Sequence, residues 1–280
     1  MKVLVTGAGG QLGRELVGAF AGHDVVGVDH ATLDVTDRDS VLQAITSTRP
    51  DAVVHAAAWT AVDACEGDPD RAFGVNALGT RHVVEGARGV GAAVCYVSTD
   101  YVFDGEKVDP YVEWDEPNPQ SAYGRSKLAG EWELGPDALV VRTSWVCGRH
   151  GHNMVKTILR LAGERDELGF VSDQRGHPTF ADDLAGMVAR LVGERRSGRY
   201  HVTNQGAVSW YEFARAVMSC AGHDPDRVKP TLTVDLDPPR PAPRPANSVL
   251  DNAALRLGGI GLLPHFHEPL ERLVRKLVHG

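Results

Sequence analysis

Short runs of β-branched and other apolar residues alternate with stretches of helical periodicity over the first half of the chain. The apolar runs occupy residues 3–5, 25–28, 52–54, 94–97 and 139–141, and helical patterns separate them, as at residues 72–88 and 126–133. Strands that are apolar on both faces and separated by helices predict a parallel sheet covered on both sides. We therefore expect an α/β fold, a Rossmann-type doubly wound parallel sheet.

The pattern changes after about residue 145. Helical periodicity marks residues 154–162, 181–192, 210–221 and 270–278, and short strand candidates occupy residues 169–171 and 200–202. Prolines crowd residues 230–245, which predicts an extended loop. We expect a nucleotide-binding domain over residues 1–145, to which some later segments return, and a smaller lobe over residues 146–280 that is mainly substrate-binding.

Composition excludes several classes of partner. The chain carries 29 Lys and Arg against 37 Asp and Glu, without a clustered basic stretch, so a nucleic-acid partner is disfavoured. No apolar run approaches the ~18 residues of a membrane span, and the apolar start is too short for a signal peptide. The four cysteines form no CxxC pair, so we expect a reducing, cytoplasmic location.

A glycine motif follows the first apolar run and precedes a helical pattern. Gly7, Gly10 and Gly13 form GxxGxxG. In a strand–turn–helix context the first glycine permits a tight turn, the second admits a pyrophosphate to the backbone, and the third lets helix and strand pack closely. A plain turn between strand and helix is the alternative, but the context favours a dinucleotide at the helix N-terminus.

An acidic residue ends the second apolar run, about 20 residues after the motif, where dinucleotide-binding folds hold the adenosine ribose. This residue is Asp29, and no arginine stands beside it to hold a 2′-phosphate, so NADH should be accepted. Asp34 and Val35 follow and are placed to reach the adenine, although a solvated loop acid is the alternative for Asp34.

A tyrosine and a lysine four residues apart predict the catalytic chemistry. Tyr123 and Lys127 share one face if their segment is helical. An adjacent ammonium favours a phenolate and would lower the pKa of the tyrosine, which suits acid–base work near neutral pH. Ser98, Thr99 and Asp100 end the fourth apolar run, where ligands bind in an open α/β sheet, and a hydroxyl there can hold a carbonyl oxygen.

Together these motifs resemble the extended short-chain dehydrogenase/reductase superfamily and, more narrowly, the dTDP-4-dehydrorhamnose reductase family. The narrower resemblance rests on GQLG at residues 10–13, AAAWTAVD at 56–63, STDYVF at 98–103, RTSWV at 142–146, DQRGHPT at 173–179 and RPANS at 244–248. It covers nearly the whole chain. The combination is specific, although each motif alone is not.

The resemblance implies reduction of the 4-keto group of a dTDP-sugar by hydride from NADPH or NADH, giving dTDP-L-rhamnose. It implies that Tyr123 donates the proton, that Lys127 holds the nicotinamide ribose, and that Thr99 hydrogen-bonds the reacting oxygen. It also implies further cofactor contacts at Gln11, Leu12, Ala57, Ala58, Trp59 and Thr60, and substrate contacts at Asp100 and Trp145. A monomer or homodimer is expected.

Four further residues have both a functional and a structural interpretation. Arg244 and Asn247 leave the proline-rich loop and would clamp the substrate pyrophosphate, because a guanidinium matches phosphate oxygens; an exposed loop arginine is the alternative. Asn153 opens a helix, where it would cap the helix or bind a substrate phosphate. Trp210 starts another helix, where we expect core packing and a stacking platform is the alternative.

Two departures from the family concern His55, where relatives usually carry asparagine, and Cys147, where they often carry tyrosine. Some relatives bind magnesium through a glutamate that matches Glu15, but no acidic cluster accompanies it in the sequence. The His-x-His pairs at residues 150–152 and 265–267 lack a third ligand, so we expect no metal site there, and magnesium at Glu15 stays an open alternative.

Three other functions compete with this one. A sugar-nucleotide dehydratase or epimerase shares the scaffold, but dehydratases place Asp-Glu after the strand-end threonine, whereas Tyr101 follows Asp100 here. A 4-ketoreductase for another dTDP-deoxysugar would carry the same motifs. A non-catalytic nucleotide-binding regulatory subunit would not need Thr99, Tyr123 and Lys127.

Overall fold

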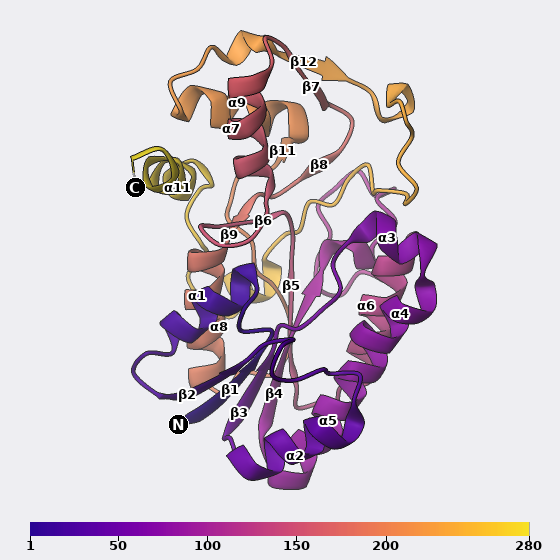
Figure 1. The fold of residues 1–280 in the computed structure, drawn as a ribbon, viewed down its shortest axis with the longest axis vertical. Helices are drawn as coiled ribbons and strands as arrows, with labels where there is room; N and C mark the ends of the chain where they lie inside the picture. The colour runs from indigo at the N-terminus through magenta and orange to yellow at the C-terminus, as the bar shows by residue number, and fades with distance from the viewer. Residues whose placement is uncertain (280) are drawn as a thin grey trace.

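A six-stranded parallel sheet forms the centre of the molecule in the computed structural model, which describes residues 1–279 (Figure 1). Its strand order is β10-β5-β4-β3-β1-β2. The strands are β1 (Lys2–Thr6), β2 (Asp24–Val28), β3 (Ala52–His55), β4 (Ala93–Thr99), β5 (Leu139–Thr143) and β10 (Gly198–His201). The α/β fold with a doubly wound parallel sheet is confirmed.

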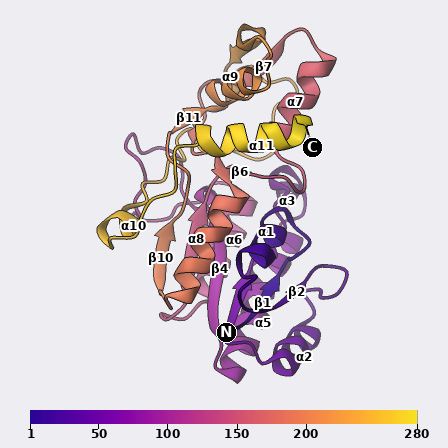
Figure 2. The same cartoon turned by 90° about the vertical axis from the view of Figure 1, so that its left-hand side faces the viewer.

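Helices cover both faces of this sheet (Figures 1 and 2). Val3 and Val5 pack in one hydrophobic cluster with α1 (Gln11–Ala19) and α8 (Ala181–Gly193). Leu4, between them, packs in another with α2 (Arg38–Thr48) and α5 (Gly79–Val90). Successive strand residues point to opposite faces, so burial on both sides requires the unbroken apolar runs seen in the sequence.

The strand order creates a crevice at the carboxyl ends of β1 and β3. From β1 the chain moves to β2 on one side and then returns to β3 on the other. Ligands of open α/β sheets bind where the strand order reverses in this way. The glycine turn follows β1 and the alanines 56–58 follow β3, so both lie at this crevice.

Two helices differ from the sequence prediction. The helix expected over residues 72–88 is divided into α4 (Pro69–Phe73), a π-helical turn (Gly74–Leu78) and α5, after the short α3 (Val62–Gly67). The helix expected over residues 126–133 is α6 (Ala122–Trp132), which begins earlier because Ser121 caps it by accepting from the N–H of Gly124. Tyr123 and Lys127 therefore lie on one helix.

The smaller lobe has its own hydrophobic core and lies beyond the carboxyl ends of the sheet strands (Figures 1 and 2). Its helices are α7 (Met154–Glu164), α9 (Trp210–Cys220) and α11 (His267–His279), and α10 (Ala253–Leu257) packs near β10. Its short strands are β6 (Val146–Cys147), β7 (Leu168–Val171), β8 (Arg175–Gly176), β9 (Thr179–Phe180), β11 (Val208–Ser209) and β12 (Val228–Thr231). β10 belongs to the main sheet and α8 packs against it, although both follow residue 145. The boundary at residue 145 stays a prediction.

The proline-rich stretch is not a loop throughout. Pro230 lies in β12, which pairs with β7, and residues 233–235 form a 3-10 turn before the extended segment begins. β12 pairs on one side only, where the missing N–H of proline is tolerated. Among residues 1–279, no helix is both long and apolar enough to cross a membrane.

Candidate active site

A pocket of about 430 Å³ opens at the carboxyl ends of the sheet strands. The glycine turn lines one end, and the end of β4, helix α6 and the start of the smaller lobe line the other. The predicted site residues that it brings together are Gly7, Gly10, Gln11, Leu12, Gly13, Ala58, Thr60, Thr99, Asp100, Tyr123, Lys127 and Trp145.

The glycine turn has the geometry that a pyrophosphate requires. Gly7 has φ +70°, and a Cβ there would lie 2.7 Å from the backbone nitrogen of Ala57. A Cβ on Gly13 would collide with the carbonyl oxygen of Gly7, so this glycine permits close packing of α1. Gly10 is the N-cap of α1 and supplies no side-chain cap, which leaves N–H groups at the helix start for an anion.

Asp29 lies directly beside this turn. Its Oδ1 accepts hydrogen bonds from the N–H groups of Ala31 and Thr32, at 3.1 and 3.2 Å. A Cβ on Gly9 would lie 3.2 Å from its Oδ2, so that oxygen faces the turn. This placement suits the predicted contact with an adenosine ribose.

The two residues predicted at the adenine are otherwise engaged. Oδ1 of Asp34 accepts from the N–H and hydroxyl of Thr36, which holds its pKa below the usual value. The side chain of Val35 is buried in the core against Gly79, so only its backbone could reach an adenine. Contacts of Asp34 and Val35 with a cofactor stay predictions.

The three predicted catalytic side chains are buried around the far end of the pocket. Lys127 donates to the carbonyl oxygen of Val97 at 2.7 Å, and its Nζ lies 4.0 Å from the ring centroid of Tyr96. Thr99 donates to Oδ1 of Asp100 at 3.0 Å. The ring of Tyr123 packs edge-on against Tyr101, with centroids 5.5 Å apart.

Burial shifts both members of the Tyr–Lys pair toward their neutral forms. It raises the pKa of Tyr123 above its usual value, and the hydroxyl of Thr99 opposes this rise. It lowers the pKa of Lys127 to about 7, against the opposing charge of Glu131. The expected lowering of the tyrosine pKa by Lys127 is therefore not found, because burial is the largest influence on this pKa and Lys127 is not among the groups that shift it. A tyrosine that keeps its proton near neutral pH is suited to act as an acid.

Two polar atoms at the same end of the pocket are buried without a hydrogen-bond partner within residues 1–279: Oδ2 of Asp100 and Oγ1 of Thr143. Burial raises the pKa of Asp100 to about 6. Thr143 is opposite Thr99 in the β4–β5 register, and it was not singled out from the sequence. Unsatisfied buried oxygens beside a cavity are suited to the hydroxyl groups of a ligand.

Asn76 supports the site, and sequence reasoning missed it. It lies in the π-helical turn and is fully buried. Its side chain accepts from the N–H of Trp59 at 2.8 Å and donates to the carbonyl oxygen of Trp59 at 3.1 Å and to Ser126 at 2.9 Å. It thereby fixes the backbone of the predicted cofactor-binding segment against α6. An asparagine in an otherwise helical pattern was the only local signal.

Gln11 and Asn153 connect the glycine turn to the smaller lobe. Asn153 caps α7 by accepting from the N–H of Lys156, and it donates to Oε1 of Gln11 at 2.8 Å. Gln11 in turn donates to the carbonyl oxygen of Val146 at 2.8 Å. The capping interpretation of Asn153 is confirmed, and its contact with a substrate phosphate stays a prediction.

The proposed pyrophosphate clamp has protein partners in the structure. Arg244 donates through both terminal nitrogens to the carboxylate of Asp63, at 2.7 Å each. The amide of Asn247 donates to the carbonyl oxygen of Lys107 at 2.7 Å and so closes the neighbouring loop. Neither residue lines the pocket, and a clamp role for either one stays a prediction.

Nothing in the part of the chain that the structure describes supports magnesium at Glu15. Its carboxylate faces His150 at 3.8 Å, and the hollow that they share is also lined by one further carboxylate, Asp182, and by the cationic Arg149, Arg272 and Lys276. Cationic side chains repel a divalent ion, which prefers oxygen ligands. Within residues 1–279, no group of three or more His, Cys, Asp or Glu is placed to hold a metal.

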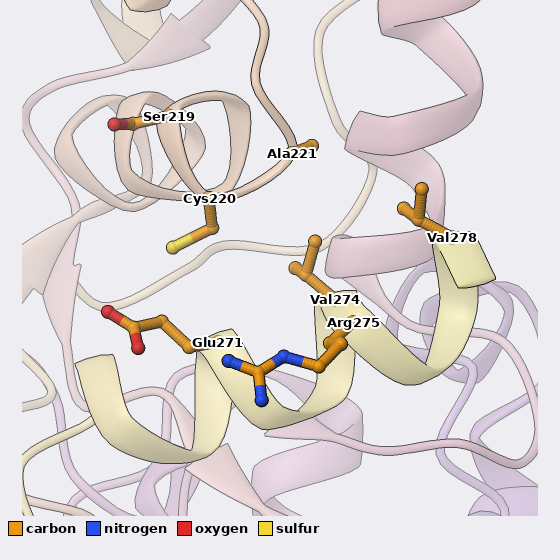
Figure 3. Close-up of a pocket in the computed structure, with 7 residues that line it drawn as sticks. All are labelled: Ser219, Cys220, Ala221, Glu271, Val274, Arg275 and Val278. Carbon is orange, nitrogen blue, oxygen red and sulfur yellow. The ribbon is translucent and has the colours of Figure 1, made fainter. Parts of the chain in front are cut away.

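A second hollow, of about 400 Å³, lies between α9 and α11, away from every predicted site residue (Figure 3). Its lining includes Cys220, Glu271 and Arg275. Burial and the charge of Glu271 raise the pKa of Cys220, which keeps the group a thiol of low reactivity.

His55 is the last residue of β3 and is fully buried. Its ring nitrogens lie 2.7 Å from the hydroxyl of Thr6 and 3.2 Å from that of Thr80. Burial, together with the charge of Lys127, lowers its pKa to about 3, so the ring is neutral in the folded protein.

We expect His55 to make the protein acid-sensitive. Its folded pKa is below the unfolded value of ~6.5, so the unfolded chain takes up a proton first and stability falls as the pH falls from ~6.5 toward 3. The contribution is about 1.4 kcal/mol per pH unit. In urea unfolding at several pH values, the free energy of unfolding of His55→Asn should fall less steeply with decreasing pH than that of the wild type. His30→Asn changes an exposed histidine and should keep the wild-type dependence on pH.

Comparisons with known proteins agree with this geometry. Residues 1–279 match the family model described as the RmlD substrate binding domain. A dTDP-4-dehydrorhamnose reductase of Streptomyces griseus is 41% identical over 95% of this chain and 91% of its own length. A probable dTDP-4,6-dihydroxy-2-methyloxan-3-one 4-ketoreductase of Streptomyces antibioticus is 42% identical over 94% and 90%. The solved dTDP-4-dehydrorhamnose reductase of Bacillus anthracis, in complex with NADP, superposes with a TM-score of 0.94 at 39% identity, covering 98% of this chain and 99% of that chain.

Proposed function

This chain belongs to the RmlD substrate-binding domain family, and on that premise we propose that it is an NAD(P)H-dependent 4-ketoreductase that converts dTDP-4-dehydro-L-rhamnose to dTDP-L-rhamnose. One observation carries the proposal. A single pocket joins the glycine cradle, at one end, to Thr99, Tyr123 and Lys127 at the other. A dinucleotide lying in the cradle would direct its reactive ring toward these side chains.

The residues at the far end divide the work of carbonyl reduction. Tyr123 keeps its proton near neutral pH and donates it to the oxygen that forms at C4. Thr99 holds the same oxygen through its hydroxyl. Lys127, anchored on the carbonyl oxygen of Val97, binds the nicotinamide ribose. The bound nicotinamide cofactor supplies the hydride that reaches C4.

The substrate end of the pocket suits a sugar. The unpartnered oxygens of Asp100 and Thr143 offer hydrogen-bonding positions for ring hydroxyls, while Trp145 offers an apolar face. Tyr101 follows Asp100, so the acid pair that an elimination across C5 and C6 would need is absent from the segment after Thr99. This supports a single hydride transfer rather than dehydration.

The cofactor preference can be tested at Asp29. We expect Asp29→Ala to raise the KM for NADH about tenfold or more, because a hydrogen bond to a charged group contributes about 1.5–3 kcal/mol. The KM for NADPH should rise less, because the carboxylate repels a 2′-phosphate. Asp39→Ala is the matched control, since the Asp39 side chain is 93% exposed and is not among the predicted cofactor contacts. A strict requirement of the wild-type protein for NADPH would contradict this role of Asp29.

A coupled assay tests the function. The protein is given dTDP-glucose, a 4,6-dehydratase and a 3,5-epimerase, and the absorbance of the reduced nicotinamide is followed. Consumption only when the epimerase is present supports the L-rhamnose assignment. Consumption of the reduced cofactor without the epimerase identifies a reductase of a D-configured 4-keto sugar. This alternative is considered because the similar protein from S. antibioticus is described as a probable 4-ketoreductase of another compound. If neither NADH nor NADPH is consumed, the result favours the alternative that the protein is a non-catalytic, nucleotide-binding regulatory subunit.

A further inference from the structure

Trp145 adopts an uncommon backbone conformation at the substrate end of the pocket. It follows β5 and has φ +46°, in the left-handed region that bulky residues seldom occupy. Such a conformation persists when the surrounding structure fixes it, and it is often found at ligand sites. The neighbours of this indole therefore indicate what fixes it.

Two residues of the smaller lobe contact the Trp145 indole closely. Trp210 stacks on it with ring centroids 3.6 Å apart and an interplanar angle of 10°. Gly176 lies so close that a Cβ there would be 2.7 Å from the indole ring. The N–H of Thr179 also donates to the carbonyl oxygen of Trp145, at 3.3 Å.

The stacking partner is itself held firmly. Trp210 is the first residue of α9, whose start is fixed by a capping box between Ser209 and Glu212. β11 pairs with β8, which places Val208 opposite Gly176. Of the two residues that contact the indole, Gly176 thus lies in this small ladder and Trp210 follows it directly. Trp210 also lines the pocket, so the expectation that it serves core packing alone was incomplete.

We propose that Trp210 is a positioning residue for the sugar subsite, which holds the indole of Trp145 as a fixed wall against the hexose. The inference rests on the proposed function. An indole face binds the C–H groups of a sugar and the methyl group of a 6-deoxyhexose, while the hydroxyl groups turn toward Asp100 and Thr143. A wall fixed in advance spares the protein the cost of ordering this side chain when substrate binds.

A double-mutant cycle tests this assignment. Trp145→Ala, Trp210→Ala and the double variant are compared for KM of the dTDP-sugar, KM of the reduced cofactor and kcat. We expect each single change to raise the sugar KM about tenfold while the cofactor KM stays within twofold. In the Trp145→Ala background, Trp210→Ala should add little, because it acts through Trp145. Trp210→Phe should recover part of the affinity.

Circular dichroism gives a readout that does not depend on turnover. Stacked indoles produce an exciton couplet, which should disappear in both single alanine variants. Trp132→Ala is the matched control, because Trp132 is 73% exposed at the end of α6, and it should keep the couplet and the wild-type KM.

Two results would overturn the positioning role. One is an unchanged sugar KM in Trp210→Ala although the couplet is lost. The other is additive effects in the cycle, which would mean that the two indoles act separately. If Trp210→Ala fails to fold, Trp210→Phe in the same cycle decides between these outcomes. A wild-type protein without turnover would instead contradict the proposed function, which separates the two failures.

Discussion

Replacing Tyr123 with phenylalanine should lower kcat by about 10²–10⁴-fold, the usual contribution of a positioned general acid. The change removes the hydroxyl and keeps the ring, so the edge-on packing against Tyr101 should survive. Cofactor binding should also survive, because Lys127 is held by the carbonyl oxygen of Val97 and not by the tyrosine.

Steady-state kinetics with a dTDP-4-keto sugar, together with a fluorescence titration of the reduced cofactor, measure these two effects separately. Tyr211→Phe is the matched control, since it removes a phenolic hydroxyl from α9 outside the pocket. Wild-type turnover in Tyr123→Phe would remove Tyr123 from the mechanism.

Replacing Glu131 with alanine should destabilise the protein by about 3–5 kcal/mol, because it leaves a buried charge uncompensated. Glu131 and Arg142 form a two-point ion pair, at 2.9 and 2.7 Å, and both side chains are only 1% exposed. Glu131 also accepts from the hydroxyl of Ser98 at 2.5 Å, so the substitution leaves a second buried polar group without its partner.

Urea unfolding compares this variant with two others. The double replacement Glu131→Met with Arg142→Met should recover most of the loss, since apolar pairs often substitute for buried ion pairs at little cost. Glu164→Ala removes an exposed pair with Arg160 and should change the free energy of unfolding by less than ~1 kcal/mol. Equal effects at the buried and exposed pairs would show that the charge of Arg142 finds another partner.

Much of the fold could be predicted from local patterns. The apolar runs predicted the first five strands in the chain. For β1, β3, β4 and β5 the reason is that an inner parallel strand is buried from both faces, whereas β2 lies at the sheet edge and is only partly buried. The GxxGxxG spacing predicted the turn beside Ala57, since only glycine fits both the conformation of Gly7 and the contact at Gly13. The spacing of Tyr123 and Lys127 placed them on one face of α6.

Other features depend on contacts between residues far apart in the chain. Arg244 donates to the carboxylate of Asp63, and Trp145 stacks on Trp210. The two members of each pair are far apart in the sequence, so no local pattern relates them. The π-helical turn that contains Asn76 was also not predicted from the sequence. The buried side chain of Asn76 is hydrogen-bonded to the backbone of Trp59, a contact that no local pattern indicates.

Local sequence accounts for the chemical groups of this protein and for which of them share a helix or a strand end, because backbone periodicity relates residues only a few positions apart. Their charge states and their partners depend on the tertiary structure. It raised the pKa of Tyr123 where the Tyr–Lys spacing predicted a lower one, because burial withdraws water from the phenolate. Arg244 pairs with Asp63 because a partly buried guanidinium is stabilised by a nearby carboxylate. Which carboxylate lies nearby depends on how loops that are distant in the sequence pack together.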